Sequence, residues 1–270
     1  MLLSVVIPTC NRQDLLVKCL DAVAASNQLL DKSNYEVIVT DDSSNNETEK
    51  ILLDQYPWVK WVAGPRKGPA SNRNNGAAKS VGEWLVFFDD DCIPDAGVLQ
   101  AYYSLISTAD VDVIEGAIYS DEHIKPLFIA PINLTGGHLW SCNFAINKRV
   151  FNALKGFDEN YKYPNLEDND LNRRIKIDGY KMIFGKEARV YHPPRPVAGP
   201  KKSALYHESW MYYHEKFGEK KTFKDLISTI VKTRLRTIVK SPKSILSVKA
   251  VWMLMQELFY TFKSRKHLSK

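Results

Sequence analysis

Short apolar runs alternate with helix-like segments over the first hundred residues of this 270-residue chain. The apolar runs predict strands, and the segments between them carry apolar side chains at helical spacing, as residues 15–23 do. Asn11 or Asp14 is expected to cap the first helix. The expected strands are 3–8, 35–40, 58–63 and 83–88, and the expected helices are 11–26, 48–55 and 72–80. This order predicts an α/β fold with a doubly wound, mostly parallel sheet and right-handed crossovers.

The pattern loosens after residue 103. Strands are expected at 112–119, 139–147 and 181–190, and a polar helix at 167–178 with Leu171 and Ile175 facing inward. Prolines and a glycine between residues 193 and 200 then predict a boundary. We therefore expect one domain over 1–200, with halves at about 1–100 and 101–200, followed by a helical extension over 201–270.

The net charge of +6 is divided unevenly between these two parts. Residues 1–200 carry 21 basic and 26 acidic side chains, a net charge of −5. Residues 201–270 carry 16 basic and 5 acidic side chains, a net charge of +11. The two parts are therefore expected to face different partners.

An apolar stripe recurs at helical spacing near the end of the extension. Its members are Val248, Val251, Trp252, Met255, Phe259 and Phe262, with Lys249, Lys263, Arg265 and Lys266 flanking them. A helix packed on the first domain would show this pattern, and so would a helix lying on an anionic membrane. The net charge of the extension favours the membrane. Nothing resembles a nucleic-acid-binding module, so no nucleic-acid partner is expected.

The cysteines and the first residues indicate a cytoplasmic protein. Cys10, Cys19, Cys92 and Cys142 form neither a close pair nor a metal-ligand spacing, which is typical of a reducing compartment. The apolar segment 1–7 lacks a basic leader and a small-residue cleavage site, so it predicts a strand and not a signal peptide. No uninterrupted apolar stretch is long enough to span a bilayer.

Three consecutive aspartates, Asp89, Asp90 and Asp91, follow the apolar run at 83–88. Three like charges cannot share a dry core, so they meet water, a cation or a ligand. Carboxylate oxygens at close spacing suit Mg²⁺ or Mn²⁺, which would neutralise a diphosphate. The alternative is a solvated acidic turn that caps a helix starting near Pro94.

Other strand ends carry polar residues suited to a ligand, namely Thr9 with Arg12, and Asp41 with Asp42. Because the carboxyl ends of parallel strands lie on one edge of a sheet, these residues are expected to meet the aspartates in one crevice. No glycine-rich G-x-G-x-x-G segment follows the first strand, which argues against a dinucleotide-binding site.

A second acidic segment holds Glu167, Asp168 and Asp170 at the start of a predicted helix. These carboxylates could stabilise the helix through its dipole. A carboxylate among other carboxylates also has a raised proton affinity, as a general base requires. His192 ends a predicted strand and could supply the neutral nitrogen ligand of a divalent metal site.

Seven motifs in order resemble the family 2 glycosyltransferases of the GT-A fold, an inverting family that uses nucleotide-sugar donors. The matching segments are 5–12 (VVIPTCNR), 41–44 (DDSS), 72–76 (NRNNG), 89–94 (DDDCIP), 143–146 (NFAI), 156–159 (GFDE) and 167–171 (EDNDL). The resemblance implies a GT-A catalytic domain over residues 1–200, with a nucleotide-binding first half and an acceptor-binding second half.

The resemblance also implies a role for each matching residue. Those that would contact the nucleotide-sugar are Pro8, Thr9, Arg12, Asp41, Asp42, Arg73, Asn74, Asp89 and Asp90, with Asp41 and Asp42 at the base, typically uracil. Asp91 would be the main ligand of Mn²⁺ or Mg²⁺, with Asp89 and His192 as further ligands. Asp168 would be the catalytic base, and Glu167 would orient the acceptor or the donor sugar. Trp140 and Asn143 are weaker candidates on the acceptor side.

The resemblance implies an inverting, metal-assisted transfer from a UDP-sugar to a hydroxyl of a saccharide or lipid-linked saccharide. The product would be a cell-surface polysaccharide or glycolipid, built in the cytoplasm or on the cytoplasmic face of the membrane. One alternative is a sugar-nucleotide nucleotidyltransferase, although residues 8–14 lack the glycine-rich phosphate loop of that class. The other is a catalytically silent subunit of a polysaccharide assembly complex, although such a subunit need not keep Asp91, Asp168 and His192.

Overall fold

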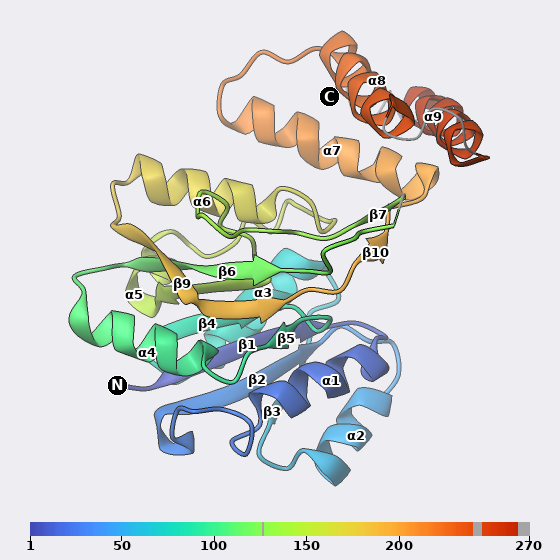
Figure 1. Ribbon diagram of the computed structural model, residues 1–270. Coiled ribbons are helices and arrows are strands. Elements are labelled where there is room, and N and C mark those ends of the chain that lie inside the picture. The colour runs from blue at the N-terminus through green and yellow to red at the C-terminus, as the bar shows by residue number, and fades with distance from the viewer. Residues whose placement is uncertain (126, 240–244, 264–270) are drawn as a thin grey trace. The chain divides into compact units, whose positions relative to one another are not determined.

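The computed structural model describes residues 1–125, 127–239 and 245–263 (Figure 1). Its contacts divide the chain into two compact units. Unit 1 comprises Met1–Ser120, Pro131–Lys162 and Glu167–Pro193, and unit 2 comprises Asp121–Ala130, Tyr163–Leu166 and Pro194–Lys270. Arg265 and Lys266 of the expected basic flank lie outside the described residues.

Unit 1 is built on an eight-stranded sheet in the order β3-β2-β1-β4-β8-β6-β9-β5. Its first half is parallel, because β1 pairs in parallel with both β2 and β4, and β2 pairs in parallel with β3. These strands are β1 (Leu3–Thr9), β2 (Tyr35–Asp41), β3 (Lys60–Ala63) and β4 (Trp84–Phe88). The four expected strands of the first hundred residues are therefore confirmed, as is the α/β class.

The second half of the sheet is mixed. β8 runs antiparallel to its neighbours β4 and β6, whereas β9 is parallel to β6. These strands are β5 (Ile93–Pro94), β6 (Val113–Tyr119), β8 (Asn143–Asn147) and β9 (Met182–Tyr191). The sheet is mostly parallel, as predicted, and one inserted antiparallel strand joins its halves.

Helices cover both faces of the sheet. Val5 and Ile7 of β1 pack in one apolar cluster with α1 and α4, whereas Val6 packs in a second cluster with α3, α5 and α6. This alternation follows from the two-residue period of a strand. The helices of unit 1 are α1 (Gln13–Val23), α2 (Glu47–Gln55), α3 (Pro69–Ala78), α4 (Val98–Thr108), α5 (Lys148–Ala153) and α6 (Glu167–Ile177).

Two local predictions are wrong. Neither Asn11 nor Asp14 caps α1, which follows Arg12 without a side-chain cap; the backbone N–H of Asn11 donates to Ser43 Oγ instead, at 2.7 Å. No helix starts near Pro94, because this residue pairs with Val190 in β9 and α4 begins only at Val98. Both deviations come from contacts between segments that are distant in sequence.

The described part of unit 2 holds three helices, orange to red in Figure 1, and a small antiparallel sheet of the green strand β7 and the orange strand β10. The helices α8 and α9, and likewise α7 and α9, pack against each other. The elements are α7 (Pro200–Lys216), α8 (Phe223–Val239), α9 (Ile245–Lys263), β7 (Phe128–Ile129) and β10 (Arg195–Pro196). Among the helices described, none combines the length and apolar character needed to cross a membrane.

Gly116 marks an irregularity in β6 where the pairing with β9 shifts register. The Tyr102 hydroxyl donates to Asn143 Oδ1 at 2.7 Å, and Asn143 Nδ2 donates to the carbonyls of Ala117 and Ala188 at 2.9 and 2.8 Å. A Cβ on Gly116 would lie 2.1 Å from Asn143 Nδ2 and 2.3 Å from the Tyr102 hydroxyl. Only glycine therefore lets this buried network form.

We predict that Gly116→Ala lowers the free energy of unfolding by about 1–3 kcal/mol, because the added methyl group forces the network apart. Urea denaturation followed by circular dichroism measures the loss. The control is Gly97→Ala at the start of α4, where the nearest atom to a new Cβ lies 3.8 Å away. That variant is expected to stay within about 1 kcal/mol of the parent. An equal loss in both variants would contradict the packing argument.

Candidate active site

Polar residues from three parallel strands meet at one edge of the sheet. Thr9 ends β1 and stands in register with Asp41 at the end of β2, and the backbone N–H of Asp42 donates to the Thr9 carbonyl at 2.9 Å. The aspartates 89–91 follow β4, the other neighbour of β1. The predicted meeting of these strand ends at one edge of the sheet is thus confirmed. Pro8 lies buried in β1, one residue before this edge.

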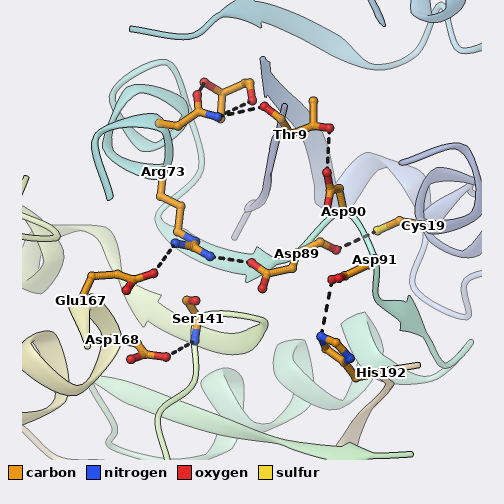
Figure 2. A network of polar contacts seen from close by, with 12 residues as sticks. Thr9, Cys19, Arg73, Asp89, Asp90, Asp91, Ser141, Glu167, Asp168 and His192 are labelled. Atoms are coloured by element: carbon orange, nitrogen blue, oxygen red, sulfur yellow. Dashed lines mark hydrogen bonds and ion pairs between the residues drawn. The ribbon is translucent and has the colours of Figure 1, made fainter. Parts of the chain in front are cut away.

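Two side chains from the β1 end bind the acidic cluster. Thr9 Oγ1 donates to Asp90 Oδ2 at 2.8 Å (Figure 2). Arg12 reaches both Asp90 Oδ1 and Asp91 Oδ2 through its two terminal nitrogens, at 2.8 and 2.5 Å. Burial raises the pKa of Asp90 to about 7, against the opposing effect of Arg12. Arg12 thereby allows neighbouring carboxylates to share a small volume.

Asp91, Cys92 and His192 bring potential metal-ligand atoms within 4.8 Å of one another, and all three residues are buried. His192 Nδ1 lies 2.9 Å from the Pro193 carbonyl, which can only accept a hydrogen bond, so this nitrogen carries the proton. The lone pair of a neutral His192 is then on Nε2, which lies 3.5 Å from Asp91 Oδ1 (Figure 2). This orientation is the one a metal-binding histidine needs.

The donor set fits a hard divalent cation. Burial raises the pKa of the Cys92 thiol well above its usual range. The Asp91 carboxylate oxygen and the His192 imidazole nitrogen are ligands that suit Mn²⁺. The sequence analysis did not name Cys92 as a potential metal ligand, although this residue directly follows Asp91.

Arg73 of α3 links the two acidic segments. It is 3% exposed and contacts Asp89 Oδ1 through Nη2 at 2.6 Å and Glu167 Oε1 through Nη1 at 3.1 Å (Figure 2). Burial disfavours the charged guanidinium, but Asp89 and Glu167 together hold the pKa of Arg73 above its usual value. The buried guanidinium of Arg73 thus connects Asp89 at the strand end to the start of α6.

Asp168 lies next to this link, in the first turn of α6. The backbone N–H groups of Ser141 and Asn169 donate to its two carboxylate oxygens at 3.4 and 2.7 Å. Burial raises the pKa of Asp168. Burial and the neighbouring Asp168 charge raise the pKa of Glu167 to about 7. The pair therefore has the proton affinity expected of a general base with a helper carboxylate.

A surface pocket opens at the ends of β2 and β3. Asp41, Trp61 and the segments 43–46 and 63–66 contribute to its lining. The backbone N–H of Arg66 donates to Asp42 Oδ1 at 2.8 Å. A Cβ on Gly64 would lie 2.2 Å from the same oxygen, so glycine is required at this close approach. The loop 64–66 was missed by sequence reasoning, because only the pairing of β2 with β3 brings it to the predicted base site.

Three other predicted site residues lie in different surroundings. Asn74 exchanges hydrogen bonds with the backbone of Phe157 at 2.9 Å each. Asn143 is 1% exposed and holds the network around Gly116. Trp140 is partly buried and stacks on His138, with ring centroids 5.1 Å apart. The side chains of Asn74 and Asn143 are therefore engaged in hydrogen bonds within the fold. The binding roles predicted for all three residues stay predictions.

The chain matches the model of the family described as Glycosyl transferase family 2 over residues 4–162, more than half of its length. Glycosyltransferase AglE of Haloferax volcanii is 34% identical over 214 residues, which cover 72% of this chain and 67% of that protein. The GalNAc(5)-diNAcBac-PP-undecaprenol beta-1,3-glucosyltransferase of Campylobacter jejuni is 37% identical over 94 residues. That match covers 33% of this chain and less than a third, 29%, of the relative.

The fold is also found in a solved structure, that of S. aureus TarS 1–349 in complex with UDP. The two superpose with a TM-score of 0.60 at 16% identity, over 99% of this chain and 92% of that chain. At this identity the likeness concerns the fold, which is of the GT-A type. The family match and the AglE match show that the chain belongs to glycosyltransferase family 2 and is a glycosyltransferase.

Proposed function

We propose that this glycosyltransferase moves a sugar from a UDP-sugar to a hydroxyl group of a saccharide or lipid-linked saccharide, with inversion and with help from a divalent metal. The observation that carries the proposal is the joining of two acidic groups through Arg73. Asp89 belongs to the strand-end cluster on one side, and Glu167 adjoins Asp168 on the other. A donor bound at the cluster would thus lie close to a carboxylate able to accept a proton.

The donor is expected along the edge formed by β1, β2 and β4. The pocket beside Asp41 and the loop 64–66 is open to the surface and offers backbone and carboxylate groups for a base. Arg12 is partly exposed and can turn from Asp91 towards a diphosphate, since its guanidinium fork matches phosphate oxygens. TarS, which shares the fold, was solved with UDP. UDP is therefore the nucleotide we propose.

Asp91 and His192 would hold the metal ion, with Asp89 as a further candidate. When bound, Mn²⁺ or Mg²⁺ supplies charge stabilisation for the leaving diphosphate, worth several kcal/mol. The protein's own contribution is to orient His192 through the Pro193 carbonyl and to keep Asp91 beside it. Arg12 neutralises the same carboxylates, so the cluster keeps its geometry among like charges.

Asp168 would act as the base. It would take the proton from the acceptor hydroxyl as that oxygen attacks the anomeric carbon from the face opposite the diphosphate. Such proton transfer contributes roughly 10²–10⁴ in rate. The N–H groups of Ser141 and Asn169 fix its carboxylate, and burial together with the nearby Asp89 charge raises its pKa. Glu167 would orient the acceptor or the donor sugar.

The proposed acceptor and cellular location are inferred from the name of one relative and from the charge of residues 201–270. The name of the Campylobacter jejuni relative describes an undecaprenol-linked acceptor. A lipid-linked saccharide would require work at a membrane surface, and the net charge of +11 over residues 201–270 would favour an anionic one. We therefore propose a cytoplasmic enzyme in polysaccharide or glycolipid synthesis, in peripheral contact with the cytoplasmic face of a membrane.

We predict that Asp168→Asn lowers the rate of transfer by about 10²–10⁴ while UDP binding is unchanged, because the amide cannot accept the proton. Turnover with a panel of UDP-sugars and calorimetry with UDP measure the two effects. The matched control is Asp178→Asn, an exposed aspartate just beyond the other end of α6, which is expected to behave like the parent. Near-normal turnover in Asp168→Asn would remove the base assignment.

The raised pKa of Asp168 predicts an acid limb in the pH profile of kcat/KM. As the pH falls through this pKa the base becomes protonated and activity is lost, and burial places the loss above the pH expected of an ordinary aspartate. In Asp89→Asn a negative charge that raises this pKa is gone and Arg73 loses a partner, so the limb is expected at lower pH. A limb at the same pH in both proteins would show that Asp168 does not control the profile.

A further inference from the structure

The apolar stripe of α9, formed by Val248, Val251, Trp252, Met255, Phe259 and Phe262, faces outward. Each of the six side chains is between 43% and 68% exposed. The spacing places all six within one face of the helix. A contiguous apolar face of this kind in a folded protein marks a surface that binds something.

The opposite face of α9 is turned inward by a charged residue. Glu257 is 4% exposed, and its carboxylate meets Arg234 Nε of α8 at 2.7 Å and His207 Nε2 of α7 at 3.1 Å. Arg234 donates in turn to Ser203 Oγ at 3.3 Å. Arg234 and His207 lower the pKa of Glu257 against the effect of burial.

These contacts fix the rotation of α9 about its own axis. Turning the stripe inward would carry Glu257 into solvent and leave Arg234 buried without its carboxylate, a costly state for a charged group. Thr261 is also buried on the inward face, where its hydroxyl donates to the Glu257 carbonyl at 2.7 Å. The inward face of α9 thus combines the polar anchors Glu257 and Thr261 with buried apolar side chains, Ala250 and Met253, while the outward stripe is apolar as well.

Lysines accompany the stripe at both ends. Lys249 and Lys263 are exposed beside its first and last members. Phe262 contacts Phe223, the first residue of α8, with ring centroids 5.2 Å apart, and Lys224 follows directly. The surface thus combines apolar side chains with basic ones, within a region of net charge +11. An anionic membrane interface is complementary in both respects.

We infer that the outward face of α9 is a membrane-docking surface, whose aromatic side chains enter the interface of an anionic bilayer while the neighbouring lysines bind lipid headgroups. The inference rests on the proposed membrane contact for its choice of partner. It goes further in assigning that contact to six apolar side chains and not to charge alone. Aromatic side chains such as Trp252 are well suited to the membrane–water interface.

The test is binding of the whole chain to phosphatidylcholine vesicles with and without phosphatidylglycerol. The double variant Trp252→Ser/Phe259→Ser is expected to lose about a hundredfold in lipid partitioning, since each large apolar side chain contributes about tenfold. The matched control is Leu53→Ser, which removes an exposed apolar side chain from α2 of unit 1 and is expected to bind as the parent does. In the parent, Trp252 fluorescence should shift to the blue with anionic vesicles, and Trp252→Phe should abolish the shift.

Three outcomes would overturn the inference. The first is that the parent stays in solution with anionic vesicles, and the second is that the double variant binds as tightly as the parent. The third is that light scattering finds a dimer that the double variant abolishes, with no binding to vesicles; the stripe is then an interface between two copies. UDP binding is measured on the same proteins, so that the two proposals are tested separately. A parent protein that does not bind UDP would count against the proposed function and not against the docking surface.

Discussion

The candidate site brings at least five carboxylates close together, and their mutual repulsion must be offset for the protein to stay folded. Arg73 is central to this arrangement, because it is buried and contacts Asp89 at the end of β4 and Glu167 at the start of α6. Arg12 plays a similar part for Asp90 and Asp91 nearer the surface. Removing one partner of a buried ion pair typically costs about 3–5 kcal/mol, so Arg73 couples the stability of the domain to the shape of its site.

Much of the catalytic unit could be predicted from the sequence. Buried parallel strands are continuous apolar runs, and the polar residues that follow them must lie on one edge, so the meeting of Thr9, Arg12 and the aspartates 89–91 was foreseeable. The family match also excludes the nucleotidyltransferase alternative. What could not be foreseen was long-range pairing. The strand at Ile93–Pro94 exists only because β9 is beside it, and the contact of Arg73 with Glu167 joins residues 94 positions apart.

The helical extension illustrates the same limit. Periodicity revealed the apolar stripe of α9, but period alone cannot say whether a stripe faces the core or the outside. The deciding residue is Glu257, a single charge on the other face, whose partners Arg234 and His207 come from two other helices. The sequence does contain an indication, because Glu257 is a lone charged residue on the face opposite the stripe. That this residue is buried becomes clear only when its partners are known.

We propose that the strand-end carboxylates and His192 form one site for a nucleotide and a divalent metal. Calorimetric titration of UDP into the parent protein and into Asp91→Asn, each with and without Mn²⁺, tests it most directly. We expect Mn²⁺ to strengthen UDP binding to the parent, and we expect this gain to be lost in Asp91→Asn. Equal binding by both proteins under both conditions would contradict the proposed site.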